Sequence, residues 1–241
     1  MIRKISVFWL RHVHPRLVTL IATIGTVGLA VCLLIIFVLG WLFEEVLERE
    51  AFSFDTSLLL WLHGQANPIL DRLMLTITQF GNPRTVVFVV IVSLVILWWR
   101  NRQEAKIFAL ACLGAVILNT GLKLAFSKPR PHLWQLLISE KSFSFPSGHA
   151  LGSLVLYGFL AYLLATHYPK STKISYSLAA IAIAAIGLSR LYLGVHWPTD
   201  VIAGYGVGFL WLMLCVTMLK LQKTSDRSLR QHERHNGRFD F

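Results

Sequence analysis

Six long apolar stretches, separated by short polar or charged segments, constrain this chain of 241 residues more than any other feature. A helix needs about 20 apolar residues to cross a bilayer core of roughly 30 Å, so runs of this kind predict membrane-spanning helices. Only 15% of the residues are charged, which agrees with a surface that faces lipid. The predicted spans are residues 17–43, 85–99, 107–122, 150–166, 174–188 and 201–219. The sequence therefore predicts an all-α fold, a bundle of six transmembrane helices.

The ends of the spans are expected to borrow flanking residues, because the second, third and fifth runs are short for a bilayer. The first run follows a basic N-terminus, as in a signal peptide, but its 27 apolar residues exceed a typical signal sequence. We therefore expect a retained first helix. Residues 43–84 mix charges with apolar clusters and contain a turn signal at residues 64–68. This pattern predicts an interfacial helical hairpin between the first and second spans.

Basic residues are distributed unevenly between the two sides of this predicted bundle. Six spans place both termini on one side, and 15 of the 23 Lys and Arg residues lie there against eight on the other. The positive-inside rule then makes the termini cytoplasmic and predicts a multi-pass protein of the plasma (inner) membrane. The cytoplasmic side carries the whole net charge of +11, because the outer charges cancel. The basic charge is thus a topology signal, aided by anionic lipids, and indicates no nucleic-acid partner.

Three polar segments gather at the outer ends of the spans. They read "KLAFSKPRP" from Lys123, "PSGH" at residues 146–149 and "SRLYLGVHWPTD" from residue 189. A single Lys or Arg at a span end usually snorkels to the interface, and a single His there is usually structural. Three cations, two imidazoles and one carboxylate on one side instead fit phosphoryl transfer, where catalysis depends on positioning and charge neutralisation.

These segments resemble the signature of the type-2 phosphatidic acid phosphatase superfamily, K-x6-RP, PSGH and SR-x5-H-x3-D. All eleven specified positions match in order, between residues 123 and 200, about a third of the chain. The matching residues are Lys123, Arg130, Pro131, Pro146, Ser147, Gly148, His149, Ser189, Arg190, His196 and Asp200. The resemblance implies a lipid phosphate phosphatase that needs no metal and no cofactor.

The resemblance also implies roles for these residues. His196 is expected to attack phosphorus and form a phosphohistidine, with Asp200 orienting its imidazole. His149 is expected to protonate the leaving group and then to activate water. The phosphate is expected to be bound by cations and by the start of the fourth span, through Lys123, Arg130, Ser147, Gly148 and Arg190. Ser147 and the nearby N–H groups form an anion site at a helix N-terminus, where Gly148 allows close approach of the phosphate.

Other sequence features favour structural roles. Cys32, Cys112 and Cys215 lie in apolar runs, which favours helix packing over disulfides. Gly204 and Gly208 form a small-xxx-small pair typical of helix packing in membranes. No motif for a metal or a nucleotide is evident. We expect one membrane phosphatase domain over residues 1–241, with a basic tail from about residue 220.

The motifs identify phosphate but not the lipid that carries it. Phosphatidic acid, phosphatidylglycerol phosphate and undecaprenyl diphosphate are therefore all candidate substrates, presented from the bilayer. Two alternatives are a lipid phosphotransferase of the same superfamily and a non-enzymatic anion transporter or binding protein. Binding alone requires no nucleophile pair, so His149, His196 and Asp200 favour an enzyme. The sequence does not define the oligomeric state.

Overall fold

The computed structural model describes residues 25–48 and 53–236, with side chains up to residue 224. Within these residues the fold is all-helical, as predicted. The elements are α3 (Thr26–Leu47), α4 (Ser53–His63), α5 (Pro68–Gln79), α6 (Pro83–Arg100), α7 (Arg102–Phe126), α8 (Gly148–His167), the short 3-10 helix η2 (Pro169–Ser171), α9 (Thr172–Tyr192) and α10 (Pro198–Asn236).

Asparagine and proline residues set where several helices begin. Asn67 and Asn82 each precede a proline, and their side chains accept N–H bonds from the first turns of α5 and α6. Asn101 caps α7 in the same way. A side-chain oxygen at the N-cap satisfies an otherwise unpaired N–H, and proline fits the first helical position because no N–H is needed there.

Six of the described helical segments are long and apolar enough to span a membrane. The predicted existence of the spans is confirmed, and their short runs do borrow flanking residues. The second, third and fifth spans extend to residues 83–100, 102–126 and 172–192, because capping residues and helix-compatible polar ends lie outside the apolar runs. The first span ends four residues later than predicted, at Leu47, and its predicted residues 17–24 lie outside the described part.

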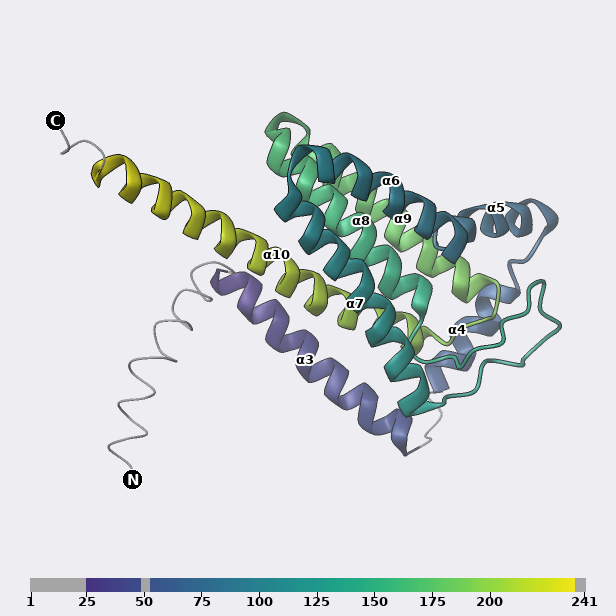
Figure 1. Ribbon diagram of the computed structural model, residues 1–241. Coiled ribbons are helices and arrows are strands. Elements are labelled where there is room, and N and C mark those ends of the chain that lie inside the picture. The colour runs from purple at the N-terminus through teal and green to yellow at the C-terminus, as the bar shows by residue number, and fades with distance from the viewer. Residues whose placement is uncertain (1–24, 49–52, 237–241) are drawn as a thin grey trace, which may run out of the picture.

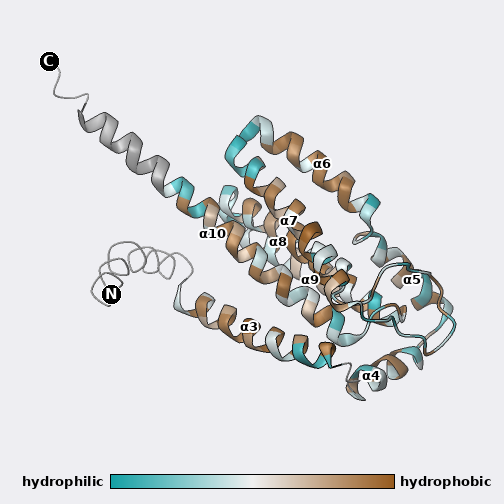
Figure 2. Cartoon of the chain, turned by 60° about the horizontal axis from the view of Figure 1, so that its bottom comes forward, coloured by the Kyte–Doolittle hydropathy of each residue, from teal (hydrophilic) through white to brown (hydrophobic). Residues whose placement is uncertain are grey.

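The α8 helix lies inside the bundle, in contact with α7, α9 and α10 (Figure 1). Its inner face carries the buried residues Leu151, Val155, Leu156 and Phe159. By contrast, most of the exposed side chains of α6 are apolar, as expected for a helix facing lipid. In Figure 2 the long helices are mostly brown, the colour of hydrophobic residues.

Two glycines bring α10 close to α8, as the small-xxx-small pattern predicted. A methyl group added at Gly204 would lie 2.6 Å from the carbonyl oxygen of Ser147. One added at Gly208 would lie 3.0 Å from the carbonyl oxygen of Leu151. Because no side chain fits in these gaps, the start of α10 is fixed against the start of α8.

The predicted hairpin is present as α4 and α5, joined by a turn at residues 64–67. It lies at the end of the bundle where α9 ends and α10 begins, beside the long loop of residues 127–147 (Figure 1). Tyr192 at the end of α9 binds the hairpin through two hydrogen bonds. Its hydroxyl donates to Asp71 at 2.8 Å and accepts from the Asn67 N–H at 3.3 Å. The hairpin therefore covers the end of the bundle that holds the three motifs.

The close packing of α8 and α10 can be tested with a single methyl group. We expect Gly204→Ala to destabilise the protein by about 1–3 kcal/mol, because the methyl meets backbone that cannot move aside. Gly121→Ala in α7 is the matched control, because nothing lies within 4 Å of its added methyl. Thermal unfolding in detergent measures both, and equal stability of the two variants would contradict this packing.

Candidate active site

His196 lies in the turn of residues 193–197 that joins α9 to α10, and it is only 1% exposed. Gly194 makes this turn possible, since its φ of +69° lies in the left-handed region that other residues rarely adopt. An added methyl at Gly194 would also lie 2.5 Å from the ring of Trp134. Pro198 then starts α10. The turn therefore holds the His196 imidazole between two helix ends.

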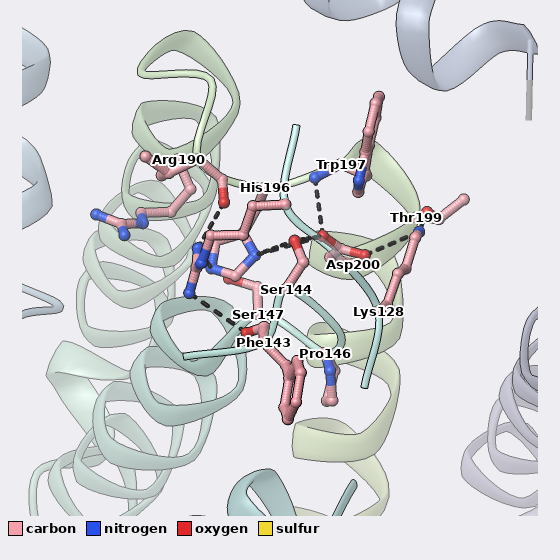
Figure 3. A network of polar contacts seen from close by, with 12 residues as sticks. Lys128, Phe143, Ser144, Pro146, Ser147, Arg190, His196, Trp197, Thr199 and Asp200 are labelled. Carbon is pink, nitrogen blue, oxygen red and sulfur yellow. Dashed lines mark hydrogen bonds and ion pairs between the residues drawn. The ribbon is translucent and has the colours of Figure 1, made fainter. Parts of the chain in front are cut away.

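Asp200, in the first turn of α10, is completely buried beside this imidazole. Its Oδ2 accepts the N–H of Trp197 at 2.9 Å and the hydroxyl of Ser144, and it lies 3.4 Å from His196 Nδ1 (Figure 3). A carboxylate held at this nitrogen favours the tautomer with its proton on Nδ1. The lone pair of the imidazole is then on Nε2.

The other nitrogen of His196 faces a cation. His196 Nε2 lies 3.3 Å from Nη1 of Arg130. The Arg130 side chain is held in place by its Nε, which donates to the Ser142 carbonyl at 2.8 Å. Burial lowers the pKa of His196 to about 4, with Arg130 and Arg190 adding to the effect and Asp200 opposing it. At neutral pH the imidazole is therefore uncharged, which is the form that a nucleophile requires.

A cavity of about 590 Å³ opens in front of His196. All three cations of the motifs line it, together with both imidazoles. These residues are Lys123, Arg130, His149, Arg190 and His196. The predicted convergence of the three motif segments at one site is therefore a feature of the structure.

Arg190 is the most deeply buried of these cations, at 1% exposure. Its Nη1 donates to Thr78 Oγ1 at 2.7 Å, and its Nη2 forms an ion pair with Glu140. Its Nε is the one buried side-chain nitrogen or oxygen in the described residues that has no hydrogen-bond partner. Since buried polar groups are normally paired, the protein's own contacts leave the hydrogen bonding of this guanidinium incomplete.

The PSGH segment starts α8, as expected, but its parts have different positions. Gly148 and His149 line the cavity. Ser147 is fully buried, is not among the lining residues, and caps the helix by accepting the Ala150 N–H at 3.5 Å. An added methyl at Gly148 would lie 2.9 Å from Asn119 Oδ1, so the start of α8 packs closely against the Asn119 side chain of α7.

Several residues that hold the site were not identified from the sequence: Asp55, Asn119, Lys128, Glu140 and Ser144. Asn119 was detectable as a polar residue inside an apolar span, and Lys128 lies in the spacer of the first motif. Asp55 and Glu140 belong to no local pattern, because their partners lie 144 and 50 residues away. Among the residues with described side chains, no group of three or more His, Cys, Asp or Glu is placed to hold a metal ion.

The fold and the site together define a multi-pass membrane protein with a cation-lined cavity at one end of its helical bundle. Comparison with known proteins agrees with this class. The profile of the PAP2 superfamily matches residues 104–223. The chain is also 34% identical over 151 residues to phosphatidylglycerophosphatase B of Bacillus subtilis, covering 61% of this chain and 74% of that protein. The chain therefore belongs to the PAP2 superfamily.

Two further comparisons support the same family. An undecaprenyl-diphosphatase of Sulfolobus acidocaldarius is 27% identical over 183 residues, which cover 74% of this chain and 84% of the relative. The crystal structure of a transmembrane PAP2-type phosphatidylglycerolphosphate phosphatase from Bacillus subtilis superposes with a TM-score of 0.68. It is 28% identical and covers 76% of this chain and 94% of its own.

Proposed function

We propose that this chain hydrolyses lipid phosphate monoesters or diphosphates through a phosphohistidine intermediate at the outer face of the membrane. PAP2-type lipid phosphatase activity fits the family and the named activities of its relatives. The observation that carries the proposed mechanism is the environment of His196. Its imidazole is uncharged, has a carboxylate at Nδ1 and stands at the wall of a cavity lined by three cations.

In the first step, Nε2 of His196 attacks phosphorus and the bond to the leaving oxygen breaks. The non-bridging oxygens are neutralised by Lys123, Arg130 and Arg190, which is the main contribution a protein makes to phosphoryl transfer. His149 gives its proton to the leaving oxygen. The negative charge of the bound phosphate favours the protonated imidazole that this donation requires.

In the second step, water attacks the phosphohistidine. His149, now neutral, takes a proton from the water as the new P–O bond forms and the P–N bond breaks. Inorganic phosphate leaves, His196 regains its lone pair and His149 is protonated again. Asp200 stabilises the positive charge that develops on His196 during attack.

The wall of the cavity fits a lipid substrate. Beyond the cations, the cavity is bounded by apolar side chains from α6, α7 and α8, including Val86, Val90, Val116 and Val155. A phosphate at His149 and His196 would thus have apolar surface beside it for an acyl or prenyl chain. The phosphatidic acid, phosphatidylglycerol phosphate and undecaprenyl diphosphate classes remain the candidate substrates.

The orientation in the membrane is proposed from charge. Along the sequence, 15 of the 23 Lys and Arg residues belong to the side of the two termini in the predicted topology, which favours a site facing the periplasm or exterior and termini in the cytoplasm. We also propose that residues 1–241 form one phosphatase domain, because the matched family region and the predicted signature occupy the same helical bundle.

Phosphate release by purified protein tests the proposed activity directly. In detergent, the wild type should release phosphate from at least one lipid of the three candidate classes. EDTA should leave this activity intact, because protein cations neutralise the phosphate, and vanadate should inhibit. His196→Ala should lose at least about 10⁴-fold in kcat, whereas His132→Ala, at an exposed histidine of the loop, should match the wild type. Anion binding without turnover on any lipid would instead indicate a binding protein.

A second test isolates the role proposed for His149. General acid catalysis is typically worth about 10² to 10⁴ in rate, and it matters least when the leaving group is already stable as an anion. In His149→Ala, most of the rate of the first step on phosphatidic acid should therefore be lost. With p-nitrophenyl phosphate the variant should release a stoichiometric burst of p-nitrophenol and then stall, because the phosphohistidine is hydrolysed slowly. Equal first-step losses on both substrates in single-turnover measurements would exclude the acid role.

Cysteine labelling tests the orientation. Ser139→Cys, at an exposed residue of the loop over the cavity, should react with an impermeant thiol reagent in intact cells. Ser171→Cys, at the opposite end of the bundle, should react only after lysis. The parent chain with its three natural cysteines gives the background. The reverse pattern would place the site in the cytoplasm.

A further inference from the structure

A charged cluster outside the predicted motifs lies behind His196. The two oxygens of Asp200 have different partners (Figure 3). Oδ2 accepts from Ser144 and Trp197 and faces His196 Nδ1, whereas Oδ1 accepts from Nζ of Lys128 at 3.0 Å. Every partner of Oδ2 is therefore neutral in the resting site, and the ion pair with Lys128 is made through Oδ1 alone.

This ion pair offsets the electrostatic cost of burying the Asp200 carboxylate. Asp200 has no solvent exposure, and an ionised carboxylate in such a place is unstable without a counter-charge. Among the described residues, Lys128 is the only Lys or Arg within 4 Å of Asp200. Lys123 and Arg130 interact with the carboxylate from farther away. Lys128 is therefore the group best placed to keep Asp200 charged.

Lys128 is itself fixed from several directions. Its Nζ donates to Thr199 Oγ1 at 2.9 Å and lies 3.9 Å from Asp55 of α4. The Thr199 hydroxyl and N–H in turn donate to the two oxygens of Asp55, at 2.7 and 3.0 Å. The ammonium also lies over the ring of Trp197, 5.9 Å from its centroid. Asp55 is only 3% exposed, so the hairpin contributes a buried anchor for this lysine.

The cluster acts on the nucleophile rather than on the phosphate. Lys128 and Asp55 are not among the residues that line the cavity, whereas His196 is. A protonated Asp200 would no longer be the full negative charge that orients the Nδ1–H and stabilises the charge on His196 during attack. Any group that controls ionisation of Asp200 therefore controls the reactivity of Nε2.

We propose that Lys128, anchored by Asp55 and Thr199, is a positioning residue that keeps Asp200 ionised and directed at His196. This inference rests on the proposed function, because it assigns a role only if His196 is the nucleophile. It also gives the α4 hairpin a part in the reaction, through a contact that spans 144 residues of sequence.

The pH profile distinguishes this role from simple structural support. In Lys128→Met the carboxylate loses its nearest positive charge, so protonation of Asp200 becomes easier. The acid limb of kcat/KM should move up by about one to three pH units, and activity should recover toward the wild-type value at alkaline pH. In Lys128→Arg the acid limb of kcat/KM should stay at the wild-type pH. Lys141→Met, which removes an exposed positive charge from the same loop, is the matched control. A loss of kcat/KM in Lys128→Met that is the same at every pH would overturn the proposal.

A double-mutant cycle provides a second measurement that does not depend on the folding of the single variant. Asp200→Asn removes the charge on which Lys128 is proposed to act. Adding Lys128→Met to this background removes both members of the buried pair and should change kcat by less than about threefold. A further loss of tenfold or more would show that Lys128 acts elsewhere. Because the assay includes His196→Ala, a failure of the nucleophile assignment is distinguishable: that variant would then retain activity whatever Lys128 does.

Discussion

The buried carboxylate of Asp200 is the constraint on which the rest of the site depends. An ionised group with no solvent exposure must obtain all its hydrogen bonds and its counter-charge from the protein. Asp200 obtains them from the loop of residues 127–147, through Lys128 and Ser144, and from the turn before α10, through Trp197. Its backbone carbonyl also accepts the N–H of Ser147 at 2.9 Å, which joins the start of α10 to the start of α8. The contacts of this one buried residue therefore hold together the loop, the turn and the ends of two helices.

The cations that line the cavity must be held close together before a phosphate arrives. Lys123 and Arg130 donate to carbonyl groups of residues 142–144, and Arg190 pairs with Glu140 and Thr78. Backbone carbonyls partly compensate the cations without neutralising them, so an entering anion still meets net positive charge. The unpartnered Nε of Arg190 marks a position where this compensation is incomplete.

The sequence predicted the spans because a bilayer imposes length and apolar composition on each helix separately. It also predicted that Lys123, Arg130 and Arg190 lie at one end of the bundle, because they follow or end the spans, and all three line the cavity. It grouped Ser147 with them, although Ser147 does not line the cavity. Span ends were less accurate, because caps such as Asn101 extend helices beyond their apolar runs. The contacts of Asp55 with Thr199 and of Glu140 with Arg190 were not predictable from the sequence. They depend on how the hairpin and the loop pack against α10 and α9, which are far away in the sequence.

The central claim is that His196 carries the phosphoryl group, and trapping the intermediate tests it most directly. Purified protein is mixed with a lipid substrate bearing radiolabelled phosphate, quenched in alkali, where phosphohistidine is stable, and digested for mass spectrometry. Label should appear on the peptide that contains His196 and should be lost in acid. With labelled p-nitrophenyl phosphate, whose leaving group hardly needs a proton, the label should accumulate further in His149→Ala, because water activation is impaired. Label on a serine peptide such as that of Ser147, or turnover with no labelled protein under single-turnover conditions, would contradict the account.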